Sequence, residues 1–324
     1  MNENRQPKVL IDATGVEFAT DDPDTFSLLF PVLGHLCGTL SDGEVPLLVG
    51  MEPHADLITK DHMKAFCAAF GTTGTSPLIH VAGVTPEARD PATVEKMKNI
   101  CSKHHIMTVE QLEDTYGILD QQEEDSGEEK IDLVALGNPH LSLSECEALL
   151  SAVKALPESQ KKHANVQIVA CMSRVLYDQS PTPTILTLRE FGMEFVQDTC
   201  WCMLLEENGG TALIPPDPAS TILTNSGKYA HYGPGLTGRK FRLGSMNDCI
   251  NAAVAGTLQR KAPSAFPWKI QTRSMSCFER KSPFVDKGLR EKPHFANLAA
   301  LKVPGGSSMQ WSRSVRFVLS RLRK

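Results

Sequence analysis

Apolar and polar positions along the first 257 residues predict strands and helices in regular alternation. Compact apolar runs, of which residues 8–13 (KVLIDA) and 131–136 (IDLVAL) are the clearest, are typical of strands buried on both faces. Residues 24–40 repeat apolar side chains at a spacing of three or four, which predicts a helix with one buried stripe. Such alternation indicates a doubly wound α/β architecture.

The remaining elements follow from the same two periods. Further strands are expected at residues 45–49, 78–84, 166–171 and 195–197, and further helices at 60–70, 92–104, 109–118, 142–156, 186–191 and 245–256. Residues 120–129 (DQQEEDSGEE) are too polar and acidic for either element, so we expect a solvated loop there.

Unusual polar segments follow three of the expected strands. They are GVTPE at 83–87, GNPH at 137–140 and DTC at 198–200. Ligands of doubly wound folds bind at the carboxyl ends of the strands, so the three segments together predict a site there. Taken singly, GNPH is more typical of a strand-to-helix turn, and GVTPE fits the start of a helix equally well.

The segment 224–235 (TNSGKYAHYGPG) has neither a strand nor a helix period, and we expect a glycine-lined loop. Ser226 and Lys228 could hold an anionic substrate group there, and Tyr229, His231 or Tyr232 could transfer a proton. A plain turn with a solvated lysine is the alternative, but it leaves the density of polar groups unexplained.

Composition is that of a globular protein, with 41% hydrophobic and 22% charged residues and a net charge of −5. The charge is uneven, because residues 258–324 hold 15 Lys+Arg against 3 Asp+Glu, whereas residues 1–257 hold 18 against 35. A basic tail therefore follows an acidic domain. The sequence shows no apolar run of membrane-spanning length and no secretory signal, which favours the cytosol.

Nine cysteines without dense, even spacing indicate reduced thiols, a few of which could bind metal. Cys200 and Cys202 form a C-x-C pair, and Cys249 lies near the start of an expected helix, where a thiolate is favoured. A buried, inert thiol is the ordinary alternative for each of them. No C-x-x-C occurs, so the sequence does not predict a zinc ribbon.

Five segments, in this order, resemble the catalytic region of the aconitase X family. They are GVTPEA (83–88), LGNPHLSLSE (136–145), DTC (198–200), TNSGKYAHYGPGLTG (224–238) and CINAAVAG (249–256). The resemblance extends from about residue 2 to about residue 256. It implies an aconitase-like α/β fold of layered strands and helices for residues 1–257.

The resemblance also implies a hydro-lyase that dehydrates a small hydroxy acid, either cis-3-hydroxy-L-proline or mevalonate 5-phosphate. An iron–sulfur cluster (2Fe-2S or 4Fe-4S) held by three cysteines would act as Lewis acid, with Cys200 and Cys249 as two of its ligands. The residues expected to bind substrate or catalyse are His140, Asn225, Ser226, Lys228, Tyr229 and His231.

The sequence departs from the family pattern at both ends. The family's segment with the third cysteine ligand and much of the pocket is missing, so an N-terminal truncation is expected, and the cluster could be absent. A small swivelling domain, fused or separate, is expected as partner. The alternative is a truncated remnant that only binds a partner or has no function of its own.

The tail, residues 258–324, resembles nothing in the family, and we expect it to be disordered. Its last twelve residues (RSVRFVLSRLRK) could instead form a basic amphipathic helix for a membrane surface or a partner. Nucleic-acid binding is a weaker alternative, since no aromatic side chains are interleaved with the charges. We therefore expect neither a nucleic-acid nor a membrane partner.

Overall fold

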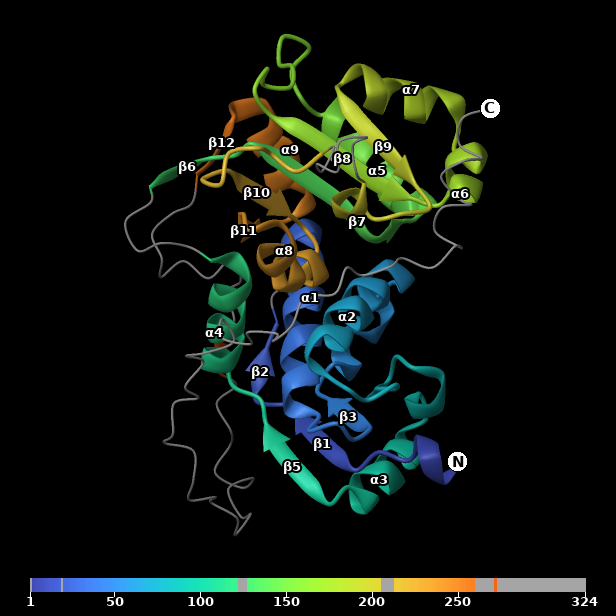
Figure 1. The fold of residues 1–324 in the computed structure, drawn as a ribbon. Helices are drawn as coiled ribbons and strands as arrows, with labels where there is room; N and C mark the ends of the chain where they lie inside the picture. Colours follow the sequence, from blue (N-terminus) through green and yellow to red (C-terminus); the bar gives the residue numbers. More distant parts are fainter. Residues whose placement is uncertain (1, 19, 122–126, 205–212, 260–270, 273–324) are drawn as a thin grey trace, which may run out of the picture. The chain divides into compact units, whose positions relative to one another are not determined.

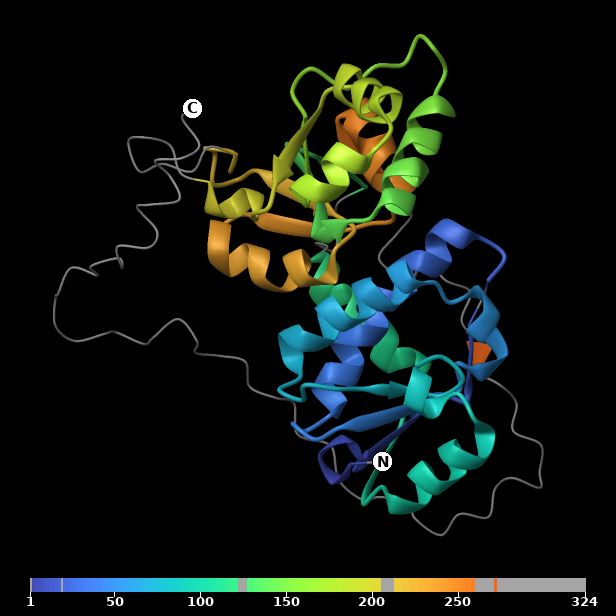
Figure 2. The same cartoon turned by 90° about the vertical axis from the view of Figure 1, so that its right-hand side faces the viewer.

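The computed structural model describes residues 2–18, 20–121, 127–204, 213–259 and 271–272. Two parallel sheets carry the described fold, each with helices on both faces (Figures 1 and 2). The α/β class expected from the alternating pattern is thus confirmed.

The first sheet is wholly parallel and has the order β4-β3-β1-β5. Its strands are β1 (Val9–Asp12), β3 (Pro46–Val49), β4 (His80–Val81) and β5 (Lys103–Ile106). Its helices are α1 (Pro23–Leu40), α2 (Lys60–Thr73), α3 (Pro91–Ile100) and α4 (Val109–Asp120). Alternate residues of β1 face different cores: Val9 and Ile11 pack with α1, α2 and α4, whereas Leu10 packs with α3. Burial on both faces explains why Val9, Leu10 and Ile11 are all apolar.

The second sheet is also wholly parallel and has the order β11-β10-β7-β8-β9. Its strands are β7 (Leu133–Leu141), β8 (Gln167–Met172), β9 (Met193–Gln197), β10 (Thr221–Thr224) and β11 (Lys240–Leu243). Its helices are α5 (Leu143–Lys154), α6 (Arg174–Gln179), α7 (Thr182–Glu190), α8 (Gly227–Thr237) and α9 (Met246–Ala255). Helices α5, α7 and α9 cover one face, and α8 covers the other.

Short elements complete the described fold. Two antiparallel pairs join β2 (Val16–Glu17) to β13 (Gln271–Thr272) and β6 (Glu128–Lys130) to β12 (Thr257–Gln259). Four 3-10 turns are η1 (Glu3–Arg5), η2 (Glu52–Leu57), η3 (Pro86–Ala88) and η4 (Trp201–Met203).

The expected loop at 224–235 is wrong, because most of it is helix α8. Its buried positions are Gly227, Tyr229, Ala230 and Gly233, which recur at helical spacing but are mostly too small to register as an apolar stripe. A Cβ at Gly233 would lie 2.2 Å from the ring of Phe241. Small residues thus let α8 pack close to the sheet, which hydrophobic periodicity does not reveal.

Two other expectations fail at their edges. The helix expected at 92–104 ends at Ile100, because the chain turns at Cys101 to enter strand β5. The GNPH segment is not a turn outside the strand, since β7 continues through it to Leu141 with a register shift. Strands β10 and β11 were not expected at all.

The boundary expected at 257/258 lies inside β12, which continues to Gln259. Apart from this end and β13, the tail 258–324 lies outside the described residues. The expected disorder of the tail and the alternative of an amphipathic helix both concern residues outside the described ranges. Residues 122–126 of the expected acidic loop also lie outside them, while Glu128 and Glu129 form part of β6.

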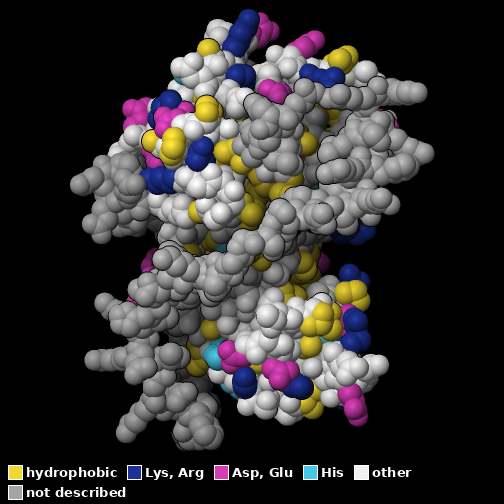
Figure 3. Space-filling view, in the orientation of Figure 1, with side chains coloured by type: hydrophobic (Ala, Val, Ile, Leu, Met, Phe, Trp, Pro, Cys, Tyr) yellow, Lys and Arg dark blue, Asp and Glu magenta, His cyan; other side chains and the backbone are white. Residues whose placement is uncertain are grey.

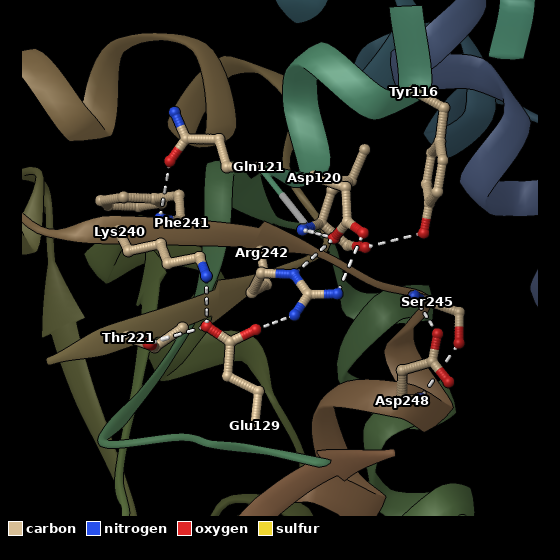
Figure 4. Close-up of polar contacts among 11 residues, drawn as sticks. Tyr116, Asp120, Gln121, Glu129, Thr221, Lys240, Phe241, Arg242, Ser245 and Asp248 are labelled. Atoms are coloured by element: carbon tan, nitrogen blue, oxygen red, sulfur yellow. Dashed lines mark hydrogen bonds and ion pairs between the residues drawn. The ribbon is translucent and has the colours of Figure 1, made fainter. Parts of the chain in front are cut away.

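A buried ion-pair network fastens the end of α4 to the second sheet (Figure 4). Arg242 of β11 donates to both carboxylate oxygens of Asp120, each at 3.1 Å, and also to Glu129 of β6. Glu129 accepts from Lys240 at 2.9 Å as well. The side chains of Arg242 and Asp120 are only 2% and 1% exposed, so the pair is part of the core.

The described surface is mixed in character. On the face shown in Figure 3, Lys and Arg side chains lie interspersed with Asp and Glu. Across the described ranges, no helix combines the length and the hydropathy that crossing a membrane demands.

Candidate active site

Strand order places the candidate site between β7 and β10. From β7 the chain proceeds outward through β8 to β9, and it then returns to the other side of β7 to form β10. The carboxyl ends of two parallel strands with connections in opposite directions leave a crevice where doubly wound folds bind ligands. A small hollow of about 30 Å³ lies there, lined by Lys64, Ala65, Gly137, Asn138, Pro139, Leu141, Glu145, Asn225, Ser226 and Gly227.

The end of β7 forms one wall of this hollow. Gly137 has φ +79°, and a Cβ there would lie 2.1 Å from the carbonyl oxygen of Cys171, so only glycine fits. The peptide bond between Asn138 and Pro139 is cis. The Asn138 side-chain amide makes no hydrogen bond to any described residue, which leaves it available to a ligand.

The amino end of α8 forms the second wall. Ser226 caps the helix, accepting from the backbone N–H of Tyr229 at 3.2 Å and donating to the carbonyl of Asn138. Asn225 precedes the cap, and within the described chain its side-chain amide is also without a hydrogen bond. The unpaired N–H groups at a helix start favour an anion, so this wall suits a carboxylate or phosphate oxygen.

A lysine–glutamate pair closes the hollow. Lys64 lies on α2, one of the helices of the first sheet. Its ammonium donates to the carbonyl of His140 at 2.9 Å and to the carboxylate of Glu145. Asp61 lies 3.4 Å from the same ammonium. Glu145 of α5 is part-buried, and its desolvation raises its pKa although Lys64 opposes the shift. A carboxylate with a raised pKa is suited to accept and return a proton.

The structure brings only part of the expected residue set to the hollow. Asn225 and Ser226 line it. His140 contributes its backbone carbonyl, which accepts from Lys64. Lys228, Tyr229 and His231 lie further along α8 and are absent from the lining. The helical rotation of 100° per residue turns Lys228 and His231 away from the cap, while Tyr229, about one turn along, is buried against Trp201.

Tyr229 and His231 have other partners. The Tyr229 hydroxyl lies 3.2 Å from the thiol of Cys200, and burial raises its pKa, so the phenol stays protonated. The His231 ring shares a 3.1 Å hydrogen bond with His35 of α1. Burial lowers the pKa of His231, and burial together with His231 lowers that of His35 to about 4. Both rings are therefore neutral at pH 7, and they join two helices rather than facing the hollow.

The two expected cluster ligands lie against opposite faces of the second sheet. Cys200 packs with Leu133 and Ile222, whereas Cys249 packs with Val134 and Leu223, the alternate positions of the same strands. Burial in this apolar core raises the pKa of Cys249 well above its ordinary value, which disfavours the thiolate needed for a ligand. Ligation of one iron–sulfur cluster by Cys200 and Cys249 does not fit this arrangement.

Cys200 has a different neighbour. Its sulfur lies 2.9 Å from that of Cys202, and the hydrogen bond from the Cys202 thiol is the main reason why the pKa of Cys200 falls to about 6. Within the described ranges, no group of three or more His, Cys, Asp or Glu side chains has the geometry to hold a metal ion.

Sequence reasoning missed Lys64 and the ligand-facing role of Glu145, whereas Asn138 lies in the segment 137–140 that was expected at the site. Glu145 appeared in the sequence only as the last residue of the segment 136–145, and in the structure it also forms a capping box with Ser142. Lys64 carries no local signal, since it is an ordinary helical lysine far from every polar segment. Only the packing of α2 against the end of β7 gives it a role.

Comparison with known proteins agrees with this fold. Residues 7–117 match the model of the aconitase X second domain, and residues 131–255 match that of the aconitase X third domain. A solved aconitase X from Thermococcus kodakaraensis in its holo-form shares the fold, with a TM-score of 0.57 and 22% identity, over 78% of this chain and 56% of that one.

Curated relatives are similar over most of the chain. A cis-3-hydroxy-L-proline dehydratase of Pseudomonas aeruginosa is 40% identical over 82% of this chain and 42% of its own length. A phosphomevalonate dehydratase large subunit of Methanosarcina mazei is 30% identical over 81% of this chain and 55% of its own. The chain thus spans about half the length of the curated relatives it matches.

Proposed function

This chain belongs to the aconitase X family, and we propose that it forms part of a hydro-lyase that removes water from a small hydroxy acid. The relatives named as dehydratases support the reaction class. The single observation that carries the proposal for this chain is the polar hollow at the switch point between β7 and β10.

The hollow offers complementary groups for the carboxylate of such an acid. Lys64 supplies a positive charge, Asn138 and Asn225 supply amide donors, and the start of α8 adds its positive end. The space is that of about one water molecule or one carboxylate oxygen. We therefore place one oxygen of the carboxylate, rather than the whole substrate, in this hollow.

Glu145 is the group best suited to take the proton from the carbon next to the hydroxylated one. Elimination breaks this C–H bond, whose electron pair forms the carbon–carbon double bond. The neighbouring C–O bond also breaks, and its electron pair leaves with the oxygen as hydroxide, which takes up one proton and becomes water. When Glu145 becomes neutral, Lys64 loses its closest counter-ion, so its charge then acts on the bound carboxylate. The positive charge of Lys64 therefore interacts mainly with the substrate carboxylate once Glu145 has accepted the proton.

Charge balance favours a hydroxylated amino acid over a phosphorylated acid. Lys64 alone among the lining residues is cationic, and Glu145 and Asp61 already face it. A substrate that carries its own ammonium group keeps this site near neutrality, whereas a phosphate adds about two negative charges. The relative with 40% identity acts, by its name, on such an amino acid.

A cofactor and a partner belong to the same proposal. The name "large subunit" of the Methanosarcina relative suggests a small subunit, and we extend this expectation to the present chain. An iron–sulfur cluster remains a prediction, and it does not rest on Cys200 and Cys249 together.

The test is loss of water from cis-3-hydroxy-L-proline and from mevalonate 5-phosphate, followed by mass spectrometry of both. The protein is prepared anaerobically with iron and sulfide, with and without a small-subunit protein of the family. We expect turnover of the amino acid and not of the phosphate. Turnover of the phosphate alone would contradict the charge argument, and no turnover of either would leave a binding protein without its own catalysis.

The matched variants are Lys64→Met and Lys60→Met, since Lys60 lies one turn earlier on α2 and is exposed. Losing a charged hydrogen bond to substrate lowers kcat/KM by about 10- to 100-fold. We expect this loss for Lys64→Met and unchanged activity for Lys60→Met. Equal activity of both variants would remove Lys64 from the site.

A further inference from the structure

We propose that Asp61 is a positioning residue of the candidate site, which holds the Lys64 ammonium beside Glu145 and the hollow. The proposal rests on the proposed dehydration, in which Lys64 binds the substrate carboxylate and Glu145 accepts the proton. Asp61 itself does not line the hollow. It therefore acts through Lys64 and Glu145 rather than on the substrate.

Asp61 connects the two helices that supply the lysine and the glutamate. It lies three residues before Lys64 on α2, and one of its carboxylate oxygens is 3.4 Å from the ammonium. The other oxygen accepts a hydrogen bond of 2.5 Å from the hydroxyl of Ser144, the residue of α5 that directly precedes Glu145. One carboxylate thus fixes α2 to α5 at the point where both enter the site.

The start of α5 continues this connection as far as the base. The hydroxyls of Ser144 and Ser142 lie 3.0 Å apart. Ser142 accepts from the backbone N–H of Glu145 at 3.1 Å, and its own N–H donates to the Glu145 carboxylate at 2.8 Å. A continuous chain of hydrogen bonds therefore runs from Asp61 to Glu145, so a shift of Asp61 displaces the base as well as the lysine.

The two carboxylates that face Lys64 differ in their affinity for a proton. Burial is the largest influence on both and raises each pKa. At Asp61, hydrogen bonds from two serine hydroxyls and the charge of Lys64 outweigh burial, so its pKa lies below the ordinary value. The pKa of Glu145 stays raised, and the charge of Asp61 is one of the causes. Paired carboxylates with opposite shifts divide into one that stays ionised and one that exchanges a proton, and Asp61 is the former.

The geometry of the ammonium leaves room for the substrate. Lys64 has three N–H donors, of which the carbonyl of His140 and the carboxylate of Glu145 occupy two. The contact with Asp61 is longer than an ordinary N–H···O hydrogen bond. Asp61 thus restrains the ammonium, also after Glu145 has become neutral, while one donor remains for the substrate carboxylate.

The first test needs no turnover and follows the protonation of Glu145 by carbon-13 NMR, in the full chain with labelled glutamate side chains. The signal of Glu145 is the one that is missing from Glu145→Gln. Asp61→Asn should move its titration midpoint to lower pH, because a nearby negative charge raises the pKa of a carboxyl group. Asp61→Glu keeps the charge and should bring the midpoint back toward that of the wild type.

The matched control is Asp56→Asn, which makes the same exchange at an exposed position of η2. It should leave the midpoint of Glu145 unchanged. Other ionisable groups nearby, His62 on α2, His140 on β7 and Cys146 and Glu147 on α5, are the same in every variant. Unchanged dispersion of the remaining glutamate signals shows that each variant is folded. A midpoint in Asp61→Asn equal to that of the wild type would overturn the proposal.

The second test is the pH profile of kcat/KM with the substrate that the wild type dehydrates. A base works only when it is deprotonated, so a lower pKa of Glu145 in Asp61→Asn should move the acid limb of the profile to lower pH. Looser holding of Lys64 should also lower kcat/KM about 3- to 10-fold at pH 7, with partial recovery in Asp61→Glu.

The outcomes separate this role from the proposed dehydration. An active wild type in which Asp61→Asn behaves like Asp56→Asn would overturn the positioning role and leave the dehydration intact. A wild type without turnover would overturn the dehydration, whereas the NMR midpoint would still decide whether Asp61 controls the protonation of Glu145.

Discussion

At the scale of single residues, the roles of the polar side chains follow from which neighbour each one meets. The histidine and tyrosine of the segment 224–235 suggested proton transfer. In the structure, however, His231 is hydrogen-bonded to His35, and the Tyr229 hydroxyl contacts a group of thiols. The hollow instead holds Lys64 and Glu145, which come from two different helices. A residue type indicates what chemistry is available, while packing decides where it is used.

The neutral His35–His231 pair predicts loss of stability in mild acid. His35 has a folded-state pKa of about 4, below the unfolded value of about 6.5, so the unfolded chain binds more protons between these values. The free energy of unfolding therefore falls as pH drops from about 6.5 toward 4, by roughly 2 kcal/mol between pH 6.5 and pH 5 for this group.

The measurement is urea unfolding of the wild type and of His35→Gln at pH 7 and pH 5. The variant keeps a hydrogen-bonding side chain without the titration, so its loss between the two pH values should be smaller. Titration of Asp24, Asp120 and Glu145, whose pKa values burial raises, is common to both proteins. An equal loss in both proteins would show that His35 does not titrate as stated.

At the scale of elements, small residues and buried charges determine contacts that periodicity does not reveal. Helix α8 packs through glycine and alanine, and α4 ends in a carboxylate that is buried against Arg242. The capping boxes of α5 and α9, by contrast, are local, because Ser142 and Ser245 each pair with a residue of the first turn of their own helix. Signals within one helix could be predicted from the sequence, and contacts between elements could not.

The Arg242 network predicts a large effect of removing its cation. Arg242→Met leaves Asp120 and Glu129 buried without their shared partner, which typically costs about 3–5 kcal/mol of unfolding free energy. Lys103→Met, which removes one partner of the exposed Lys103–Asp42 pair, should cost less than about 1 kcal/mol. Urea unfolding of both variants at pH 7 checks the difference, and equal small losses would contradict the burial of the network.

At the scale of the whole described fold, the second sheet places a strand pair with diverging connections at its centre. In the second sheet this pair is β7 and β10, and the hollow lies at its carboxyl end. The same sheet separates Cys200 from Cys249. A layer of strands can thus gather residues far apart in sequence at one edge, and keep other residues apart on its two faces.

The separation of the two cysteines predicts different accessibility. In the native protein iodoacetamide should modify Cys67 and leave Cys249 unmodified, and both should react after unfolding in urea. Cys249→Ala should also bind as much iron as the wild type after anaerobic treatment with iron and sulfide. Native alkylation of Cys249, or iron loss in this variant alone, would show that Cys249 reaches a metal site.

The sequence by itself determined the α/β class, most elements up to residue 200 and the family, because these depend on periodicity and on ordered motifs. It also named Asn225 and Ser226 as substrate-binding residues, and both line the hollow, although the strand that precedes them was not expected. Only the tertiary structure decided that 224–235 is mostly helix, that Lys64 and Glu145 close the hollow, and that Cys249 faces away from Cys200. Those facts depend on which face of an element meets which neighbour, and this is fixed by packing between distant segments rather than by any local pattern.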